Sequence, residues 1–352
     1  MKMIKNELLA NYTSFGVGGP ADSLIFVESS EELISALENT SSEPITLIGY
    51  GSNCLISDRG IRGTVICTRG GAIDIADTMI TVDAGVWWDD VVQAAIDNEL
   101  WGIELMGEIP GSVGASAFIN ITAYGQAFGS VVSWIDVWDM NARELRRIPA
   151  DELEWGYKES YFQQNPQLII VRVQLSLSRT PTSDVRYQKA LDVAAELDLD
   201  MHTLTGRRAV IHEARNRAGS LWHFNDNAIH TVGSFFRNPI VDLETAEHII
   251  GFDETGKTKT EIRKMNQVHG GDTKRISAAH VMLASGFSRG QQWGKVKLNN
   301  QNLLKIEALP GATAQEIYDV ATHIQQTAQQ KLGVRLEPEA SILGDFNKSQ
   351  PI

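Results

Sequence analysis

The sequence predicts an α+β fold of two or three lobes; two observations support the fold class and a third supports the number of lobes. Short apolar runs bounded by glycine or polar residues, which are typical of strands, alternate with stretches of helical spacing in the first part of the chain. Helical spacing then dominates the last third. A length of 352 residues exceeds what one hydrophobic core usually holds, so we expect two or three lobes with boundaries near residues 70 and 215.

Hydrophobic periodicity and the punctuation between apolar runs place the individual elements. The helix expected at residues 31–39 follows a Ser-Ser start, and the helix expected at 313–332 keeps large aliphatic residues on one face. The other expected helices are 87–100, 206–218, 243–251 and 276–285. The expected strands are 44–49, 63–67, 78–85, 131–140 and 168–177.

Charge and composition argue against several classes of protein. The 31 basic and 44 acidic residues give a net charge of −13, which disfavours binding to nucleic acid or to an anionic membrane, although a local basic pocket for a phosphate remains compatible with it. The sequence shows no signal peptide and no run approaching the roughly 20 apolar residues of a membrane span. Cys54 and Cys67 form no CxxC motif, and no metal site is expected. We therefore expect a cytoplasmic monomer that binds small molecules.

Two glycine-rich motifs are candidates for binding an anion. In LIGYGSN (residues 47–53) a strand runs into a turn whose glycines expose backbone N–H groups, beside the polar side chains of Ser52 and Asn53. A tight connection between strands explains this motif equally well. The motif IPGSVGAS (residues 109–116) has the same character. Two such motifs favour one extended, phosphate-containing cofactor lying across both.

Two further motifs contain groups suited to acid–base chemistry. Ser234 lies in GSFF (residues 233–236), where its side chain either packs for shape or moves a proton. In VRLEPEASILG (residues 334–344), Glu337 and Glu339 flank Pro338 and would point to the same side of a strand. A solvated sheet edge explains the two glutamates, and so does a carboxylate in a dry pocket whose raised pKa makes it a general acid.

Taken in order, these motifs resemble those of the UDP-N-acetylenolpyruvoylglucosamine reductase (MurB) family. The matching segments are NYTSFGVGGPAD, GYGSN, IPGSVGAS followed by INITAYG, WGYKESYF, VRYQKAL, GSFFRNPIV and LEPEASILG. The resemblance implies a two-part FAD-binding domain of the vanillyl-alcohol oxidase (PCMH) type and a carboxy-terminal α+β domain that binds substrate. The implied regions are 1–70 for the first FAD-binding subdomain, with 333–352 packing back on it, 71–214 for the second subdomain and 215–332 for the substrate domain.

The resemblance also implies where FAD binds. The motif GYGSN would contact the pyrophosphate, because glycine lets the backbone approach the phosphates closely. Residues 109–116 would line the other side of the cofactor, and Arg215 is a further candidate contact. The residues carried over from the family are Gly49, Gly51, Ser52, Asn53, Ile109, Pro110, Gly111, Ser112, Gly114, Ala115, Ser116, Asn120, Ala123, Tyr124 and Arg215.

In the family's reaction, NADPH first reduces FAD, and the enolpyruvyl ether of UDP-N-acetylglucosamine is then reduced to UDP-N-acetylmuramate for peptidoglycan. This step serves cell-wall biogenesis, cell shape and cell division. Flavin N5 delivers hydride, and Ser234 would donate the proton. Glu339 and Lys158 would support the enolate-like intermediate. Tyr187, characteristic of the longer subtype, would close over the nucleotide diphosphate, and Asn238 would lie on the substrate side.

Lys158 departs from the family, whose catalytic residue at this position is the arginine of GYR[DE]S. Lysine keeps the charge but loses the planar fork that binds a carboxylate through two hydrogen bonds. The family's lysine for the substrate phosphates is not evident before GSFF, although Arg217 lies near the aligned position. Two alternatives therefore remain open: a related flavoenzyme that reduces a different activated alkene, and a catalytically silent module that binds flavin or a UDP-sugar.

Overall fold

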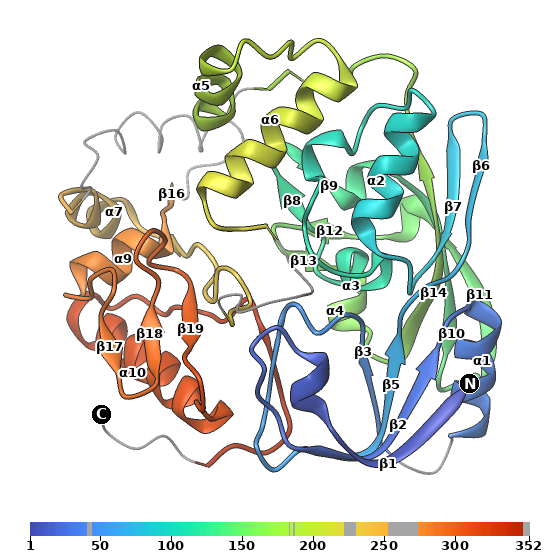
Figure 1. The fold of residues 1–352 in the computed structure, drawn as a ribbon, viewed down its shortest axis with the longest axis horizontal. Coiled ribbons are helices and arrows are strands. Elements are labelled where there is room, and N and C mark those ends of the chain that lie inside the picture. Colours follow the sequence, from blue (N-terminus) through green and yellow to red (C-terminus); the bar gives the residue numbers. More distant parts are fainter. Residues whose placement is uncertain (41–43, 183, 186, 222–229, 253–273, 348–352) are drawn as a thin grey trace. The chain divides into compact units, whose positions relative to one another are not determined.

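The computed structural model of the chain describes residues 1–40, 44–182, 184–185, 187–221, 230–252 and 274–347 (Figure 1). Helices and strands are mixed throughout, which confirms the expected α+β class. The chain forms two compact units. The first unit contains the described parts of residues 1–7, 21–51 and 62–221, and the second contains the described parts of residues 8–20, 52–61 and 230–347.

The first unit contains a four-stranded sheet in the order β1, β2, β5, β3. β3 runs parallel to β5, and helix α1 packs its apolar residues Leu33 and Leu37 against side chains of β2 and β5. Two glutamates in the first turn of α1 favour its start, because carboxylates interact well with the positive end of a helix dipole. The bounds are Lys2–Leu8 (β1), Pro20–Val27 (β2), Ser30–Asn39 (α1), Ile45–Ile48 (β3) and Ile61–Thr68 (β5).

A second, five-stranded antiparallel sheet has the order β11, β10, β14, β7, β6. Helices α2 and α3 contribute to the large apolar cluster that also holds the inward side chains of this sheet, including the fully buried Trp88. The bounds are Ile73–Ala76 (β6), Met79–Asp83 (β7), Trp88–Asp97 (α2), Val113–Phe118 (α3), Val132–Asp139 (β10), Glu144–Pro149 (β11) and Leu168–Ser176 (β14).

Short elements complete the first unit, and two of them contain predicted site residues, Ala123 in β8 and Arg215 in α6. The small antiparallel pairs are β8 with β9 and β12 with β13. Helices α5 and α6 pack on each other. The bounds are Glu104–Met106 (η2), Thr122–Ala123 (β8), Gln126–Ala127 (β9), Phe128–Val131 (η3), Ala150–Glu152 (η4), Trp155–Gly156 (β12), Glu159–Ser160 (β13), Tyr161–Gln164 (α4), Gln188–Glu196 (α5) and Leu204–Arg217 (α6).

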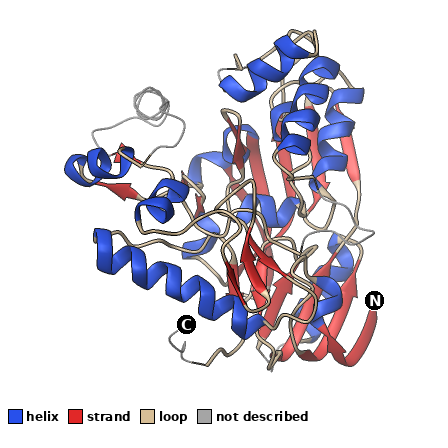
Figure 2. Cartoon of the chain, turned by 60° about the vertical axis from the view of Figure 1, so that its left-hand side comes forward, coloured by secondary structure: helices blue, strands red, loops and turns tan. Residues whose placement is uncertain are grey.

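The second unit is built on the antiparallel sheet β17–β18–β19 and the long helix α10, with strands red and helices blue in Figure 2. A capping box at Thr313 starts α10, and Gly333 in the left-handed conformation ends it. The bounds are Leu9–Tyr12 (η1), Cys54–Ile56 (β4), Ile240–Val241 (β15), Leu243–Ile250 (α7), Lys274–Arg275 (β16), Ala278–Ala284 (α9), Gln292–Trp293 (β17), Val296–Leu298 (β18), Ile306–Ala308 (β19), Ala314–Leu332 (α10) and Ser341–Leu343 (β20).

The sheet of the second unit has one apolar and one polar face, because side chains alternate along β18 and β19. Val296, Leu298 and Ile306 belong to the apolar cluster that includes α10. The alternate positions hold Lys297, Asn299, Lys305 and Glu307. Asn299, Lys305 and Glu307 are nevertheless at most 7% exposed. This sheet therefore has a polar face that is also buried.

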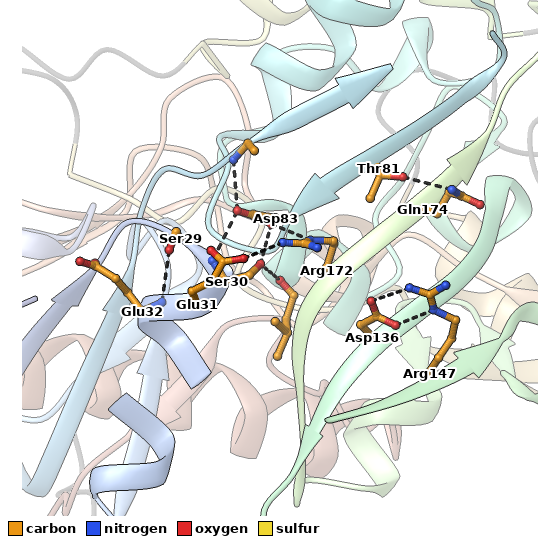
Figure 3. Close-up of polar contacts among 12 residues, drawn as sticks. Ser29, Ser30, Glu31, Glu32, Thr81, Asp83, Asp136, Arg147, Arg172 and Gln174 are labelled. Atoms are coloured by element: carbon orange, nitrogen blue, oxygen red, sulfur yellow. Dashed lines mark hydrogen bonds and ion pairs between the residues drawn. The ribbon is translucent and has the colours of Figure 1, made fainter. Parts of the chain in front are cut away.

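Asp83 is the centre of a buried polar network that ties α1 to two strands of the five-stranded sheet (Figure 3). Its carboxylate accepts hydrogen bonds from the Ser30 hydroxyl at 2.5 Å, the Arg172 Nε at 2.9 Å and the backbone N–H of Ala72 at 3.1 Å. The Ser30 hydroxyl also contacts the Val171 carbonyl oxygen at 3.0 Å. Burial alone would raise the pKa of Asp83, but these hydrogen bonds and the positive charge of Arg172 outweigh burial and lower it.

No helix among the described residues combines the length and the apolar character needed to cross a membrane.

We predict that Asp83→Asn lowers the free energy of unfolding by about 2 kcal/mol at neutral pH, because it removes a charge-assisted hydrogen bond from Arg172 and weakens those from Ser30 and Ala72. The folded-state pKa of Asp83 lies below 3.8, so its stabilising contribution is complete above that pH and is lost as the pH falls through the folded-state value. Urea unfolding at several pH values measures both effects.

Asp136→Asn is the matched control for this prediction. Asp136 pairs with Arg147 at 2.7 Å, and the Arg147 side chain is 56% exposed. We expect this change to cost less than about 1 kcal/mol, because water screens an exposed pair. Equal losses in the two variants would contradict the central role assigned to Asp83.

Candidate active site

The two glycine-rich motifs meet inside the first unit. A Cβ atom built on Gly49 would lie 2.7 Å from the Ser112 Oγ and 3.3 Å from its Cβ. Only a residue without a side chain lets the backbone pass Ser112 this closely. Gly51 has a φ of +66°, in the left-handed region that favours glycine. The structure therefore brings together two motifs that the sequence separates by about sixty residues.

The first amides of helix α3 are used within the protein. Val113 N–H donates to the Val86 carbonyl at 2.9 Å, and Gly114 N–H donates to the Ala84 carbonyl at 2.8 Å. The Ser112 hydroxyl caps the helix by accepting from Ala115 N–H at 3.3 Å. A ligand contacting residues 109–116 would therefore meet side chains and backbone atoms other than the amides of Val113, Gly114 and Ala115.

The remaining residues of this stretch differ in exposure. Gly111 accepts a hydrogen bond from Trp88 N–H at 2.9 Å through its carbonyl oxygen. Ser112 and Ser116 are 2% exposed, while Ile109 and Pro110 are half-buried. The Cys67 thiol donates to the Gly49 carbonyl of the first motif at 3.5 Å. Burial raises the pKa of Cys67 to about 11. A thiol in this state is a poor nucleophile, so Cys67 has a packing role.

Asn120 fixes the hairpin that presents Lys158. Its amide nitrogen donates to the Gly156 carbonyl at 2.7 Å, and its amide oxygen accepts from Gly129 N–H at 2.9 Å. Asn120 is 4% exposed and has a φ of +47°, a conformation that asparagine tolerates. Lys158 lies in the turn between β12 and β13 with a φ of +57°. The structure thus gives Asn120, predicted to contact the cofactor, two backbone partners within the protein.

Arg215 is a half-buried cation near Tyr124, and its Nε atom is buried. Its Nη2 donates to the Ser220 carbonyl at 2.9 Å, while its buried Nε has no hydrogen-bond partner among the residues that the structure describes. Burial lowers the pKa of Arg215, and the nearby Tyr124 and Glu108 oppose this shift. The rings of Tyr124 and Tyr187 meet edge to face with their centroids 5.2 Å apart. Three predicted residues, Tyr124, Tyr187 and Arg215, therefore lie in one neighbourhood.

Two ion pairs fix helix α6, which carries Arg215. Arg207 pairs with Glu104 at 2.7 Å, and both side chains are at most 5% exposed. Arg208 binds both carboxylate oxygens of Asp89, at 2.5 and 2.6 Å. Because one buried and one half-buried pair hold α6, the guanidinium of Arg215 is presented from a rigid element.

In the second unit, the segment containing Ser234 lies between two other strands. Phe235 N–H donates to the Leu304 carbonyl at 2.8 Å, and the Phe235 carbonyl accepts from Glu339 N–H at 2.7 Å. Arg237 N–H also donates to the Glu337 carbonyl, at 2.9 Å. The GSFF and EPE motifs are therefore adjacent. Ser234 and Glu339 are both half-buried, whereas the Glu337 side chain is 59% exposed.

Two predicted asparagines have structural contacts in this unit. The side-chain amide of Asn53 donates to the Glu339 backbone carbonyl at 3.2 Å. The backbone carbonyl of Asn53 accepts from Ser341 N–H at 3.0 Å. The Asn238 amide oxygen accepts from Ala278 N–H, the first residue of α9, at 3.0 Å. Asn53 thus anchors the strand that carries Glu339, and Asn238 caps a helix.

The remaining predicted residues, Ala123 and Ser52, and Arg217 have the following burial and contacts. Ala123, in β8, is half-buried and packs against the main apolar cluster of the first unit. Ser52 is 8% exposed. Arg217 pairs with Glu196 at 2.6 Å and with Glu213 at 2.7 Å. Within the described residues, no group of three or more His, Cys, Asp or Glu side chains is placed to hold a metal ion.

Lys305 is the residue of this region that the sequence did not point to. It forms an antiparallel bridge with Ser234 and is 3% exposed. The alternation of apolar and polar residues in LLKIEA (residues 303–308) was the available signal, since it puts Lys305 and Glu307 on one face of a strand. The pairing of that strand with GSFF could not be read from the sequence.

Comparison with known proteins connects these features to one family. Residues 224–343 match the family model described as the C-terminal domain of UDP-N-acetylenolpyruvoylglucosamine reductase, and residues 21–146 match an FAD binding domain. A UDP-N-acetylenolpyruvoylglucosamine reductase of Salinispora arenicola is 30% identical over 94% of this chain and 93% of the relative. A UDP-N-acetylenolpyruvoylglucosamine reductase of Thermobifida fusca is 29% identical over 97% of this chain and 98% of the relative.

The fold agrees with the same comparison. The crystal structure of UDP-N-acetylenolpyruvylglucosamine reductase (MurB) from Thermus caldophilus superposes with a TM-score of 0.64 at 23% identity, covering 97% of this chain and 98% of the other. The expected architecture of an FAD-binding part and a carboxy-terminal α+β part is confirmed.

The close approach of the two glycine motifs gives a prediction. Gly49→Ala should destabilise the protein by about 1–2 kcal/mol, because the new methyl group meets the Ser112 Oγ. Ser112→Ala should cost about 1 kcal/mol through loss of the helix cap. In the double variant the loss should be smaller than the sum, because removing Oγ makes room for the methyl group; denaturant unfolding measures all three.

Thr203→Ala serves as the control, because Thr203 caps α6 through Gly206 N–H at 3.0 Å. Its loss should add to that of Gly49→Ala without coupling. Additive losses for Gly49 and Ser112 would show that the two motifs do not meet as described.

Proposed function

Because the chain belongs to the UDP-N-acetylenolpyruvoylglucosamine reductase family, we propose that it reduces the enolpyruvyl ether of UDP-N-acetylglucosamine to UDP-N-acetylmuramate in peptidoglycan synthesis. It is an oxidoreductase with FAD as cofactor and NADPH as co-substrate. The observation that carries the specific reaction is the adjacency of the GSFF and EPE motifs, which supplies a hydroxyl and a carboxylate from neighbouring strands.

The residues of the first unit fit a flavin dinucleotide. The buried Arg215 Nε, unpartnered among the described residues, offers a hydrogen bond to an anionic group, and the close passage of Gly49 past Ser112 forms a backbone surface without a side chain. Tyr124 lies beside Arg215 with an aromatic ring available for stacking. We assign FAD binding to the predicted residues of the two glycine motifs together with Tyr124 and Arg215.

When bound, the reduced flavin supplies the hydride, from N5, that adds to the vinyl carbon of the substrate. The adjacent carbon then carries negative charge delocalised into the substrate carboxylate, and Ser234 donates the hydroxyl proton to it. A serine hydroxyl is a weak acid at neutral pH, but a carbanion-like carbon is a strong base, so the transfer is favourable. The half-buried position of Ser234 limits competition from water for this proton.

Glu339 and Lys158 are proposed to support the same intermediate. Glu339 has its backbone fixed on both sides, by Phe235 through its N–H and by Asn53 through its carbonyl, so the origin of its side chain is fixed. Lys158 projects from a two-residue turn that Asn120 holds through Gly156. Such positioning lets a charged group stabilise developing charge without reorganising during the reaction.

Tyr187 and Asn238 are proposed to bind substrate, as the family resemblance implies. Tyr187 precedes α5 and is 50% exposed, so its ring can close over a nucleotide. The Asn238 oxygen is engaged at α9, which leaves its amide N–H₂ as the group for substrate. We retain as proposals the limits 1–70 with 333–352, 71–214 and 215–332 for the two FAD-binding subdomains and the substrate domain.

Ser234→Ala should leave flavin reduction by NADPH nearly unchanged and slow flavin reoxidation by the enolpyruvyl UDP-sugar at least about a hundredfold, because only the second half-reaction needs the proton. Stopped-flow absorbance of the flavin measures each half separately. Equal slowing of both halves would show that Ser234 supports the fold instead. Wild-type protein that bleaches with NADPH but does not recover its colour with this substrate would favour a different alkene.

Lys158→Arg should preserve or raise the rate of the second half-reaction, by up to about tenfold, because a guanidinium grips a carboxylate through two hydrogen bonds. Lys158→Met is the matched loss of charge and should slow the same step. An inactive arginine variant with normal flavin content would mean that the pocket is shaped around an ammonium group.

A further inference from the structure

Charged side chains attach the start of the second glycine motif to helix α6. Glu108, the residue before IPGSVGAS, donates its backbone N–H to the Asp89 carboxylate at 2.6 Å. The carboxylate of Glu108 contacts the His212 Nδ1 at 2.6 Å and lies 3.7 Å from the Arg208 guanidinium. Since Arg208 also binds both oxygens of Asp89, side chains from α2, from the motif's first turn and from α6 form one connected network.

Most of this network is removed from water. The side chains of Asp89, Glu108 and Arg208 are at most 21% exposed, whereas His212 lies at the rim and is more than half exposed. Burial raises the pKa of Asp89, but the hydrogen bonds from Arg208 and from Glu108 N–H outweigh burial and lower it. Charge-assisted hydrogen bonds at this depth are stronger than exposed pairs, so the network holds its members in fixed positions.

The backbone of Glu108 has a conformation that is unfavourable for its residue type. Its φ is +60°, in the left-handed region that favours glycine. The preceding residue, Gly107, lies so close to α6 that a Cβ atom built on it would be 2.5 Å from the Arg208 Nη1. Backbone strain that the surroundings hold in place is concentrated at functional sites, and this strain lies directly before a proposed FAD-binding motif.

The face of α6 that contacts Glu108 also carries Arg215. Arg208, His212 and Arg215 are spaced i, i+4 and i+7 along the helix and therefore lie on one face. Burial lowers the pKa of Arg215, and the carboxylate of Glu108 is among the groups that oppose this shift. The start of the motif and the proposed FAD-binding cation thus lie along the same face of one rigid helix.

We propose that Glu108 is a positioning residue for FAD: its carboxylate holds the start of the IPGSVGAS motif against α6, so that the motif and Arg215 keep the spacing that the cofactor needs. This inference rests on the proposed FAD contacts of residues 109–116 and of Arg215. A ligand that contacts two elements already held together binds at a lower entropic cost than one that must bring them together. The role involves no covalent step.

The test is the affinity of the full-length chain for FAD, measured by titrating deflavinated protein with FAD and following the flavin fluorescence. Glu108→Ala should raise the dissociation constant about tenfold, because the motif is then no longer held against α6. Glu108→Gly lacks the same carboxylate but adopts a φ of +60° without strain. It should therefore resist urea better than Glu108→Ala and still bind FAD as weakly.

A merely structural role would make affinity follow stability, so the glycine variant would then bind FAD more tightly than the alanine variant. That result would contradict the proposal. A dissociation constant within about twofold of wild type in both variants would contradict it as well.

The decisive measurement is the double variant with Arg215→Gln. If Glu108 acts by fixing the spacing between the motif and Arg215, Glu108→Ala raises the dissociation constant less than threefold once the guanidinium is absent. Arg215→Lys, which removes the Nε donor and keeps the charge, replaces it if glutamine impairs folding, with the same expectation. Multiplied increases would overturn the proposal, because they would show that Glu108 affects FAD independently of Arg215.

Glu196→Gln is the matched control. Glu196 also pairs with an arginine of α6, Arg217, at 2.6 Å, but it comes from α5 and its side chain is 61% exposed. We expect the dissociation constant of this variant to stay within about twofold of wild type. A tenfold rise here would show that any loosening of α6 weakens FAD binding, against a specific role for Glu108.

Failure of the proposed FAD site would look different. Arg215→Gln would then bind FAD with wild-type affinity, whatever residue stands at position 108.

Discussion

The two backbone hydrogen bonds of Phe235, one donated and one accepted, determine which strands lie side by side in this part of the second unit. Phe235 binds Leu304 through its N–H and Glu339 through its carbonyl, so one short segment joins two strands that are distant in the sequence. The phenyl rings of Phe235 and Phe236, buried in the apolar cluster, hold this segment in register. Because a slip of one residue would turn every side chain to the other face, the same register places Ser234 beside Lys305.

Buried charge in the first unit is paired in a comparable way. Asp83 with Arg172, and Glu104 with Arg207, join elements through a carboxylate and a guanidinium, and each carboxylate also accepts a hydrogen bond from a backbone N–H. Additional hydrogen bonds of this kind are what allow an ion pair to be buried. Arg215 differs, because its Nε has no partner within the described residues, and this difference supports the proposal that Arg215 binds a ligand.

Several residues expected at the site have a second role in the protein. Asn120 links Gly156 and Gly129, Asn53 links Glu339 and Ser341, and the Ser112 hydroxyl caps α3. A motif that resembles a binding sequence therefore also contains the residues that support the site. Substitutions at such positions change both geometry and binding, so a half-reaction or coupling measurement is needed to separate the two.

The sequence by itself determined the fold class, the family resemblance and the long helices, since α1, α2, α6 and α10 lie where apolar spacing indicated. Local pattern was sufficient there, because the backbone hydrogen bonds of a helix lie within one segment and repeat its apolar face at a fixed spacing. It did not predict the short strands β17, β18 and β19, which are only two or three residues long. Only the tertiary structure decided that Lys305 lies beside Ser234 and that Asn120 holds the Lys158 turn, because strand register depends on partners far along the chain.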